Sequence, residues 1–510
     1  MKYFMGLDNG GTTTKAALFD AGGKQIAVCS MDTKAITEKP GFVERDMEEM
    51  WDANCRVIKG VLEKAGISGE DVSGIGICGH GKGLYLWGKD NQPCRKGIIS
   101  TDNRAYKYVE KWKEDGTEDR VYKISYQHIM SCQPVSLLAW LKDNEPENYS
   151  NIKYIFECKD YVRFRLTGEA KAEITDYSGA NFLNLSTGKY DKELLKLFDI
   201  VEVEEALPPL IYSDEVAGYV TKEAAIKCGL KEKTPVVGGF FDICASAVAS
   251  GVINPDNICM IAGTWSINEY ISQQPILDGK IQMNSLFCIP NYYLIEESSA
   301  TSAGNNEWFI NQLLPEVKEE RKKMKSNIYE MVNKWVEEIP VKDFVPVFLP
   351  FLMSSNVHPN AKASFIGLNV SHSRKYLVRS VYEGIAFSHR YHLEKLLESK
   401  KEMPGCIRLS GGAAKSKVWV QMFADIMQIP VETVESDEVG ALGCAIAAAK
   451  ATGEYVSLDE AIKNMTTINK AVEPNLSNKE IYNKKYQIYL EAIRCLDGLW
   501  NSMQDLVESL

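Results

Sequence analysis

An apolar strand that runs into a turn of glycine and threonine occurs twice in the chain, and this repeat limits the fold more than any other feature. The first copy is residues 3–7 with Gly-Gly-Thr-Thr at 10–13, and the second is residues 258–262 with Gly-Thr at 263–264. Loops at strand ends are where α/β folds bind ligands. The repeat predicts two similar α/β halves that each present such a turn to a shared cleft.

The first eighty residues have the pattern of a sheet covered by a helix. Residues 3–7, 15–19 and 25–29 are apolar runs separated by turn residues, which predicts an antiparallel meander. Residues 46–62 place apolar side chains at helical spacing, with Asp46 as the N-cap. Residues 72–78 predict a further strand that ends in a glycine-rich loop.

The second half contains comparable signals. Residues 235–242 predict a strand and a turn, followed by a short helix at 244–250. The clearest helical pattern begins behind Ser416, and the Gly-Gly pair at 411–412 before it could support an adenine or a ribose, or could be a simple strand-to-helix turn. The predicted helix at 439–450 has Ala and Gly on nearly every face, so its backbone should lie close to a neighbour.

Composition excludes several classes of partner. The 510 residues carry 58 Lys+Arg and 69 Asp+Glu, a net charge of −11, so no summed positive field exists to hold nucleic acid or an anionic membrane. Apolar stretches fall short of the roughly 20 residues that span a bilayer, and the N-terminus lacks a secretory signal pattern, which predicts a cytoplasmic protein. The 13 cysteines form no C-x-x-C pair and are expected to be reduced core residues.

The turn after the first strand carries groups that suit phosphate. Residues 8–15 are Asp-Asn-Gly-Gly-Thr-Thr-Thr-Lys. Glycine lets backbone N–H groups approach phosphate oxygens, threonine adds O–H donors, and Asp8 could hold Mg²⁺ through its water ligands. A hairpin turn made of ordinary turn residues explains the segment equally well.

Asp242 is the candidate catalytic base. It follows an apolar strand and precedes a short helical pattern, where a carboxylate could accept a proton from a hydroxyl. The alternative is that it only caps the helix, as an aspartate in this position commonly does. The Gly-Gly pair at 238–239 and the second Gly-Thr turn favour the catalytic interpretation.

Two further pairs could serve either a ligand or the fold. His80 and Lys82 lie in the glycine-rich loop, where they could bind substrate hydroxyls or could be polar residues facing solvent. Asp102 and Arg104 could form an ion pair at a helix start, or could fix substrate oxygens through charge-assisted hydrogen bonds.

Together and in this order, these segments resemble the FGGY family of carbohydrate kinases over nearly the whole chain. The resemblance implies the two-lobed α/β ATPase fold of actin, hexokinase and Hsp70, with a central mixed sheet flanked by helices in each lobe. It implies an N-terminal lobe at 1–245, with the sugar site and first phosphate turn, and a C-terminal lobe at 246–510, with the second phosphate turn and the adenosine site. The matching segments are 6–15, 133–141, 238–242, 366–384 and 410–416.

The resemblance implies phosphorylation of a sugar hydroxyl, with ATP and Mg²⁺ as cofactors. Asp242 matches the catalytic aspartate, which also contacts substrate, and Asp8 matches the carboxylate near the metal. The implied substrate-binding residues are His80, Gly81, Lys82, Asp102 and Arg104. The implied phosphate- and ATP-binding residues are Gly10, Gly11, Thr12, Thr13, Thr14, Lys15, Gly263, Thr264, Gly304, Gly411, Gly412 and Ser416.

Departures from the family pattern bear on the substrate. Ser136 and Tyr376 stand where the family prefers a lysine and a polar residue, and Ile243 stands where D-xylulose kinases usually have asparagine. The loop at 81–84, with residues 41–47 and 134–140, is instead similar to L-xylulose kinases, which favours a ketopentose such as L-xylulose. Glycerol, erythritol, D-xylulose, D-ribulose and gluconate are the alternatives.

Two functions from other classes compete with the kinase. One is an actin- or Hsp70-type ATPase, which should lack a sugar-lining loop, and the other is a sugar sensor that does not phosphorylate, which the pair Asp8 and Asp242 argues against. The resemblance implies a sugar and ATP as binding partners, neither nucleic acid nor membrane, and either a monomer or a homodimer.

Overall fold

The computed structural model describes residues 2–353, 355–400 and 402–509, and the chain forms two compact units. The first comprises Met1–Ile253, Ile271–Ile295 and Glu435–Thr467, and the second comprises Asn254–Tyr270, Glu296–Val434 and Ile468–Leu510. The lobes expected at 1–245 and 246–510 stay a prediction. The compact units differ from them because two later segments pack with the first unit.

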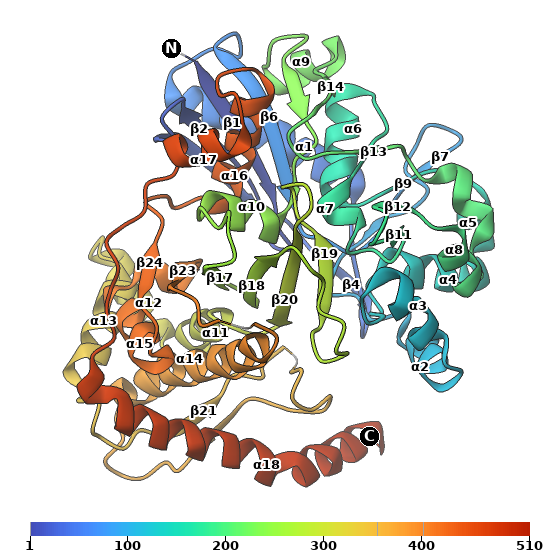
Figure 1. Cartoon of the computed structure of the whole chain (residues 1–510). Helices are drawn as coiled ribbons and strands as arrows, with labels where there is room; N and C mark the ends of the chain where they lie inside the picture. Colours follow the sequence, from blue (N-terminus) through green and yellow to red (C-terminus); the bar gives the residue numbers. More distant parts are fainter. Residues whose placement is uncertain (1, 354, 401, 510) are drawn as a thin grey trace. The chain divides into compact units, whose positions relative to one another are not determined.

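A seven-stranded sheet forms the centre of the first unit (Figure 1), in the order β14-β15-β6-β1-β2-β3 with β16 beside β6. The strands are β1 (Tyr3–Asn9), β2 (Thr13–Asp20), β3 (Gln25–Asp32), β6 (Val72–Gly79), β14 (Val216–Tyr219), β15 (Pro235–Val237) and β16 (Phe240–Phe241). The first three strands pair antiparallel, which confirms the predicted meander, and β6 runs parallel to β1. The parallel pairing brings the ends of β1 and β6 to one edge of the sheet.

Helix α16 (Val439–Ala451) packs against one face of this sheet at backbone distance. A Cβ built on Gly6 of β1 would lie 1.9 Å from the Ala441 carbonyl oxygen, and one on Gly76 of β6 would lie 2.2 Å from that of Cys444. The close approach predicted from the Ala and Gly content of this helix is therefore confirmed. Because side chains alternate along a strand, Asp8 lies on the same face as Gly6.

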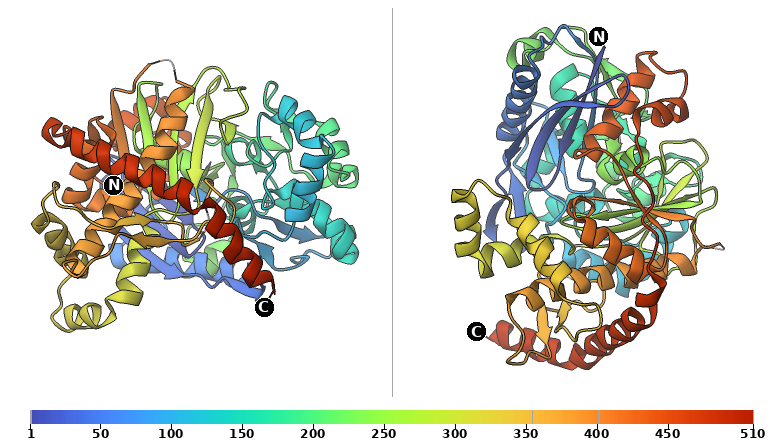
Figure 2. Two further views of the ribbon diagram at one scale, coloured as in Figure 1. Left: turned by 90° about the horizontal axis from the view of Figure 1, so that it is seen from below. Right: turned by 90° about the vertical axis from the view of Figure 1, so that its left-hand side faces the viewer.

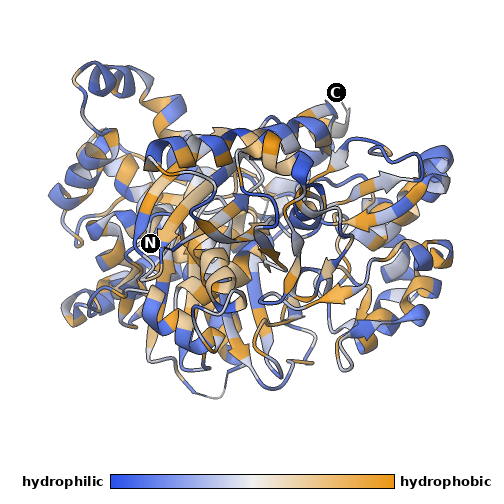
Figure 3. Cartoon of the chain, turned by 90° about the horizontal axis from the view of Figure 1, so that it is seen from above, coloured by the Kyte–Doolittle hydropathy of each residue, from blue (hydrophilic) through white to orange (hydrophobic). Residues whose placement is uncertain are grey.

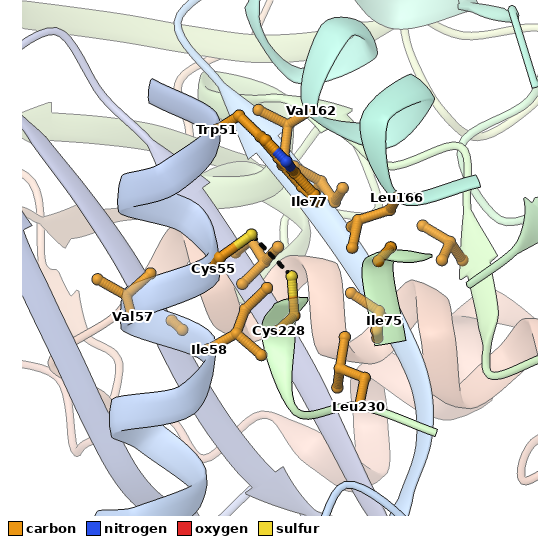
Figure 4. Close-up of a cluster of buried hydrophobic side chains, with 14 of the residues drawn as sticks. Trp51, Cys55, Val57, Ile58, Ile75, Ile77, Val162, Leu166, Cys228 and Leu230 are labelled. Carbon is orange, nitrogen blue, oxygen red and sulfur yellow. Dashed lines mark hydrogen bonds between the residues drawn. The ribbon is translucent and has the colours of Figure 1, made fainter. Parts of the chain in front are cut away.

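The opposite face of the sheet is covered by α1 (Met47–Ala65), α6 (Cys158–Thr167) and α9 (Lys222–Cys228). Asp46 caps α1 by accepting a hydrogen bond from the Glu49 N–H at 2.8 Å, as predicted. Trp51, Ile75 and Val162 belong to the core under these helices (Figure 4), where the thiols of Cys55 and Cys228 lie 2.9 Å apart. All 13 cysteines are free thiols and ten of them are buried, as expected of core residues.

The second unit contains β17 (Asn257–Ala262) between antiparallel β18 (Ser266–Ser272) and parallel β23 (Cys406–Ser410), with β24 (Val431–Thr433) parallel to β23. Its helices are α11 (Gly304–Leu313), α12 (Pro315–Lys323), α13 (Ile328–Glu338), α14 (Arg374–Glu398), α15 (Lys417–Met427) and α18 (Lys479–Ser509). The long α18 leads to the C-terminus (Figure 2). Parallel pairing places the ends of β17 and β23 at one sheet edge.

The described part of the chain contains further strands and α-helices. The strands are β4 (Ile36–Lys39), β5 (Phe42–Arg45), β7 (Tyr85–Gly88), β8 (Gly97–Ile98), β9 (Ile152–Phe156), β10 (Ala172–Glu173), β11 (Leu183–Asn184), β12 (Lys189–Tyr190), β13 (Leu210–Ile211), β19 (Met283–Leu286), β20 (Tyr293–Ser299), β21 (Val347–Leu349) and β22 (Ser364–Ile366). The helices are α2 (Tyr106–Glu114), α3 (Thr117–Ser125), α4 (Pro134–Asn144), α5 (Pro146–Ser150), α7 (Ile174–Tyr177), α8 (Lys192–Leu197), α10 (Asp242–Ala249) and α17 (Leu458–Met465).

Surface helices have hydrophilic and hydrophobic residues side by side along their length (Figure 3), as amphipathic helices do. None of the helices in the described part of the chain has both the length and the apolar character that a membrane crossing requires.

Candidate active site

The predicted phosphate turn of the first unit connects β1 to β2. The Gly10 N–H donates to the Thr13 carbonyl at 3.0 Å, and the Thr12 side chain is exposed. Thr14 differs from its neighbours because it is buried in β2, where its hydroxyl donates to the Asn9 side chain at 3.2 Å. Lys15 forms an ion pair with Glu438 at 2.8 Å. The turn itself is therefore residues 10–13.

Asp8 lies beside this turn, on the α16 face of β1. A Cβ built on Gly440 would lie 3.2 Å from the Asp8 Oδ2 atom, so the absence of a side chain there leaves room for the carboxylate. Burial raises the pKa of Asp8, and the negative charge of Glu438 adds to this while Lys15 opposes it. The carboxylate is thus held partly desolvated at the edge of the sheet.

Asp242 is the first residue of α10 and does not cap it. Phe241 occupies the N-cap position, where no side chain caps the helix. The preceding Gly239 has a φ of 81°, and a Cβ on it would lie 1.9 Å from the Ile77 carbonyl oxygen, so only glycine fits this turn. The strand-turn-helix segment therefore carries Asp242 to the edge where β1 and β6 end.

The electrostatics around Asp242 disfavour its charged form. Burial raises the pKa of Asp242 well above its ordinary value, and the negative charges of Asp8 and Asp176 raise this pKa further. The positive charge of Lys82 and the Ile243 N–H act in the opposite direction. A strongly perturbed carboxyl group beside other charged groups is typical of a functional site.

A buried charge network holds the segment before Asp242, and the sequence interpretation missed it. The Phe241 N–H donates to the Thr175 hydroxyl at 3.0 Å, and that hydroxyl donates to Glu173 at 2.7 Å. Arg163 donates to the Gly238 carbonyl at 2.5 Å and pairs with a neighbouring aspartate, Asp160, at 2.7 Å. The charges at 160 and 163 are three residues apart on one face of α6, and this spacing is the signal that could have revealed the network.

The donor set of the first unit fits a magnesium ion. Mg²⁺ usually takes one or two protein carboxylates and completes its shell with water and substrate phosphate. Asp8 and Asp242 are neighbouring carboxylates whose mutual repulsion a divalent cation would relieve. Among the described residues no group of three or more His, Cys, Asp or Glu could hold a metal ion, so the protein alone offers no closed metal cage.

The glycine-rich loop packs beside Asp242 rather than facing solvent. His80 is 6% exposed, its Nε2 lies 2.9 Å from the Tyr85 hydroxyl, and burial lowers the pKa of His80 to about 4. Lys82 adopts a φ of 64° and places its ammonium 5.3 Å from the centre of the Phe241 ring. A Cβ on Gly81 would lie 2.5 Å from the same ring. The loop is therefore in contact with the residue that precedes Asp242.

Asp102 and Arg104 form a buried ion pair. The Arg104 Nη2 atom lies 2.8 Å from the Asp102 Oδ2 atom, and Asp102 also accepts from the Val43 N–H at 2.6 Å. The guanidinium stacks on Phe42 and Trp140, at 4.5 and 5.0 Å from their ring centres. The geometry matches the ion-pair interpretation, and a role in binding substrate stays a prediction.

In the second unit, the predicted ATP-binding residues gather where β17 and β23 end. The Gly304 N–H donates to the Gly263 carbonyl at 3.3 Å, and the Thr264 carbonyl accepts from the Ser302 N–H at 3.0 Å. Gly411 has a φ of 84°, and a Cβ on it would lie 2.6 Å from the Ala262 carbonyl oxygen. The two turns are thus packed against each other.

Ser416 has a structural role in the same region. It is the N-cap of α15, accepting from the Trp419 N–H at 3.3 Å, and its hydroxyl donates to Asn333 at 2.8 Å. The helix predicted behind Ser416 is confirmed. A contact between Ser416 and a nucleotide stays a prediction.

The glycines of the predicted phosphate turns differ from those that the fold requires. A Cβ on Gly11 would meet no atom within 4 Å, and one on Gly263 or Gly412 would approach nothing closer than 3.9 and 3.8 Å respectively. The packing of the protein therefore gives no reason for glycine at these three positions. A close approach of the backbone to a ligand would give one.

Comparison with known proteins agrees with this geometry. Residues 3–249 match the N-terminal domain, and residues 258–452 the C-terminal domain, of the FGGY family of carbohydrate kinases. The chain is 36% identical to the L-xylulose/3-keto-L-gulonate kinase of Escherichia coli over 499 residues, which cover 98% of both chains. It is also 36% identical over 507 residues to a probable L-xylulose kinase of Haemophilus influenzae, covering 98% of this chain and 100% of the relative.

Solved structures show the same likeness. A xylulose kinase from Lactobacillus acidophilus has a TM-score of 0.87 to this chain at 26% identity, with 99% of this chain and 100% of that chain covered. The predicted α/β fold of the actin and hexokinase type is confirmed by this likeness.

Proposed function

The chain belongs to the FGGY family of carbohydrate kinases, and from this premise we propose that it transfers the γ-phosphoryl group of ATP to a hydroxyl of a ketopentose such as L-xylulose. Two relatives at 36% identity over nearly the full chain carry L-xylulose in their names, and one of them is also named for 3-keto-L-gulonate.

In the proposed mechanism, Asp242 orients the sugar hydroxyl and accepts its proton as the oxygen attacks phosphorus. The single observation that carries this role is the combination of position and electrostatics: Asp242 begins α10 without capping it, and its pKa is raised well above its ordinary value. A raised pKa makes a carboxylate a stronger base, which favours proton transfer from a hydroxyl.

The two glycine turns and the adenosine turn are assigned to the nucleotide. Backbone N–H groups of the two turns, those of Gly11 and Thr12 in the first and of Thr264 in the second, donate to phosphate oxygens and stabilise the charge of the phosphoryl group during its transfer. Gly304, Gly411, Gly412 and Ser416 are assigned to the remainder of ATP. Asp8 would hold Mg²⁺, and a bound Mg²⁺ would neutralise charge on the phosphate oxygens.

The sugar is assigned to the loop that contacts Phe241. His80 is uncharged at neutral pH because its pKa is about 4. The neutral ring can therefore donate a hydrogen bond to a sugar hydroxyl or accept one from it. Gly81 and Lys82, together with Asp102 and Arg104, are assigned to the same pocket, in which the two cations would bind sugar oxygens.

An ADP-release assay across a panel of sugars tests the proposal. L-xylulose, 3-keto-L-gulonate, D-xylulose, D-ribulose, glycerol, erythritol and gluconate are compared at equal concentration with Mg-ATP. The highest kcat/KM is expected for L-xylulose. ADP formation that does not depend on sugar would indicate an ATPase instead, and sugar binding without ADP formation would indicate a sensor.

A further inference from the structure

Arg45, at the end of β5, forms hydrogen bonds with the backbone of the predicted first phosphate turn. Its side chain is buried, with the residue 2% exposed. The Nη2 atom donates to two successive carbonyl oxygens of the turn, that of Gly10 at 3.1 Å and that of Gly11 at 2.5 Å. One nitrogen therefore fixes the direction of two neighbouring peptide groups.

The direction of these carbonyls determines where the turn presents its amides. No peptide bond in the described part of the chain is cis, and in a trans peptide the N–H points opposite to the C=O. With the Gly10 and Gly11 carbonyls directed at Arg45, the N–H groups of Gly11 and Thr12 point away from it. Neither N–H has an acceptor among the described residues. Two adjacent amides that point the same way form a site for an anion.

Part of the Arg45 guanidinium has no polar partner among the described residues. Its Nε and Nη1 atoms are buried and make no hydrogen bond with the residues that the structure describes, and none of these residues forms an ion pair with it. A buried guanidinium without a carboxylate is unfavourable on its own. An anion bound at the turn would supply the missing charge, and burial strengthens that attraction.

We propose that Arg45 is a positioning residue for the phosphate of ATP. It directs the Gly11 and Thr12 N–H groups toward the phosphate and places a positive charge behind them. This inference rests on the proposed function of the turn, but it concerns a residue outside that assignment and makes its own prediction about ATP binding.

Substitution of Arg45, with a matched control, tests the proposal. Arg45→Met removes both charge and donors, whereas Arg45→Lys keeps a charge and can still donate to the two carbonyls. The control is Arg379→Met in α14, because Arg379 is 3% exposed and also donates from one nitrogen to two carbonyls, those of Val336 at 2.8 Å and Ile339 at 2.5 Å. It loses the same two-carbonyl contact, together with an ion pair to Glu383 at 2.8 Å, without touching the turn.

ATP binding is measured by calorimetry without sugar, and turnover with the best sugar of the panel. Arg45→Met is expected to weaken ATP binding at least tenfold and to lower kcat by about 100-fold, as for loss of a preorganised oxyanion donor. Arg45→Lys should recover ATP binding to within about tenfold of the unsubstituted protein. The dissociation constant for the sugar should stay within threefold in both variants, and Arg379→Met should change only the melting temperature.

A measurement on the unsubstituted protein keeps the test decisive if Arg45→Met does not fold. With [¹⁵N]arginine labelling, the side-chain Nε resonance that is missing in Arg45→Lys belongs to Arg45. This resonance should shift when ATP is added without sugar.

An Arg45 resonance that ATP does not shift would overturn the inference, as would ATP binding in Arg45→Met equal to that of the unsubstituted protein. Equal loss of ATP binding in Arg45→Met and Arg379→Met, in proportion to lost stability, would also overturn it. If ATP shifts the resonance but no sugar in the panel is phosphorylated, the proposed function fails while this inference stands.

Discussion

Replacement of Asp242 by asparagine should make the protein more stable and nearly inactive at once. Asparagine has almost the same shape but carries no charge and cannot accept a proton from a hydroxyl. Because Asp242 is partly buried near Asp8 and Asp176, its charged form is unfavourable in the folded state. Holding a carboxylate at this position therefore lowers the stability of the folded protein. This is expected of a catalytic group and not of a helix cap.

The size and pH dependence of the stability gain follow from linkage. The pKa of Asp242 is raised in the folded state, so its ionisation opposes folding. The penalty is absent below about pH 4, where the acid is protonated in both states, and it grows as pH rises toward the folded-state pKa. Each unit by which the folded-state pKa of Asp242 exceeds the unfolded-state value corresponds to about 1.4 kcal/mol of stability that the variant gains once the pH is above both values.

Urea denaturation from pH 4 to pH 8 measures this difference, and the ADP assay measures the activity. The difference in unfolding free energy between the two proteins should be near zero at pH 4 and should increase with pH. Turnover should fall by about 10² to 10⁴, the usual contribution of a positioned base. Asp191→Asn is the control, since Asp191 caps α8 by accepting from the Glu193 N–H at 2.9 Å and asparagine caps equally well.

Asp242 would be excluded as the base if Asp242→Asn were as stable as the unsubstituted protein at every pH and turned over within tenfold of it. A variant less stable at pH 8 would also contradict it, because that result would show that the carboxylate stabilises the fold.

Three other substitutions or titrations test neighbouring features. Gly239→Ala should destabilise the first unit by at least about 2 kcal/mol in urea denaturation, because a Cβ would lie 1.9 Å from the Ile77 carbonyl oxygen at a φ of 81°; an unchanged denaturation midpoint would be contrary evidence. Gly11→Ala should leave the melting temperature of the protein alone unchanged, because the Cβ meets no atom within 4 Å, yet should reduce the stabilisation that ATP provides; equal stabilisation would argue against phosphate at this turn. The His80 ring should stay neutral from pH 5 to pH 9 in an NMR titration, since its pKa is about 4, and a midpoint near 6.5 would contradict its burial.

Local patterns sufficed to predict the elements that carry the candidate site. Alternation and turn residues located the three-stranded meander, and helical spacing behind Asp46 located α1 with its cap. These features depend on residues close in sequence, so the chain reveals them directly. The Gly and Ala content of α16 predicted close backbone contact, but the identity of its partners, β1 and β6, depended on the folded arrangement.

The residues that hold the site in place could not be predicted in the same way. Thr175 supports the segment before Asp242, and Arg45 supports the turn at 10–13, each from a distant part of the sequence. A threonine before an aspartate and an arginine at a strand end are ordinary in sequence. Their roles come from hydrogen bonds to backbone atoms, which every residue type has, so the sequence gives no sign of them.

Two glycines show why the sequence located the turns but could not tell which of them serve the fold and which serve a ligand. In sequence, Gly239 and Gly11 are equivalent members of Gly-Gly pairs. In the structure, Gly239 is required by the Ile77 carbonyl against it, whereas no neighbouring atom requires glycine at position 11. A residue that the fold itself does not demand is explained by what approaches it. For Gly11 the approaching group must accept hydrogen bonds, because the N–H groups of Gly11 and Thr12 point away from Arg45 with no acceptor among the described residues. An anionic oxygen meets that requirement, which supports the proposal that the phosphate of ATP binds at this turn.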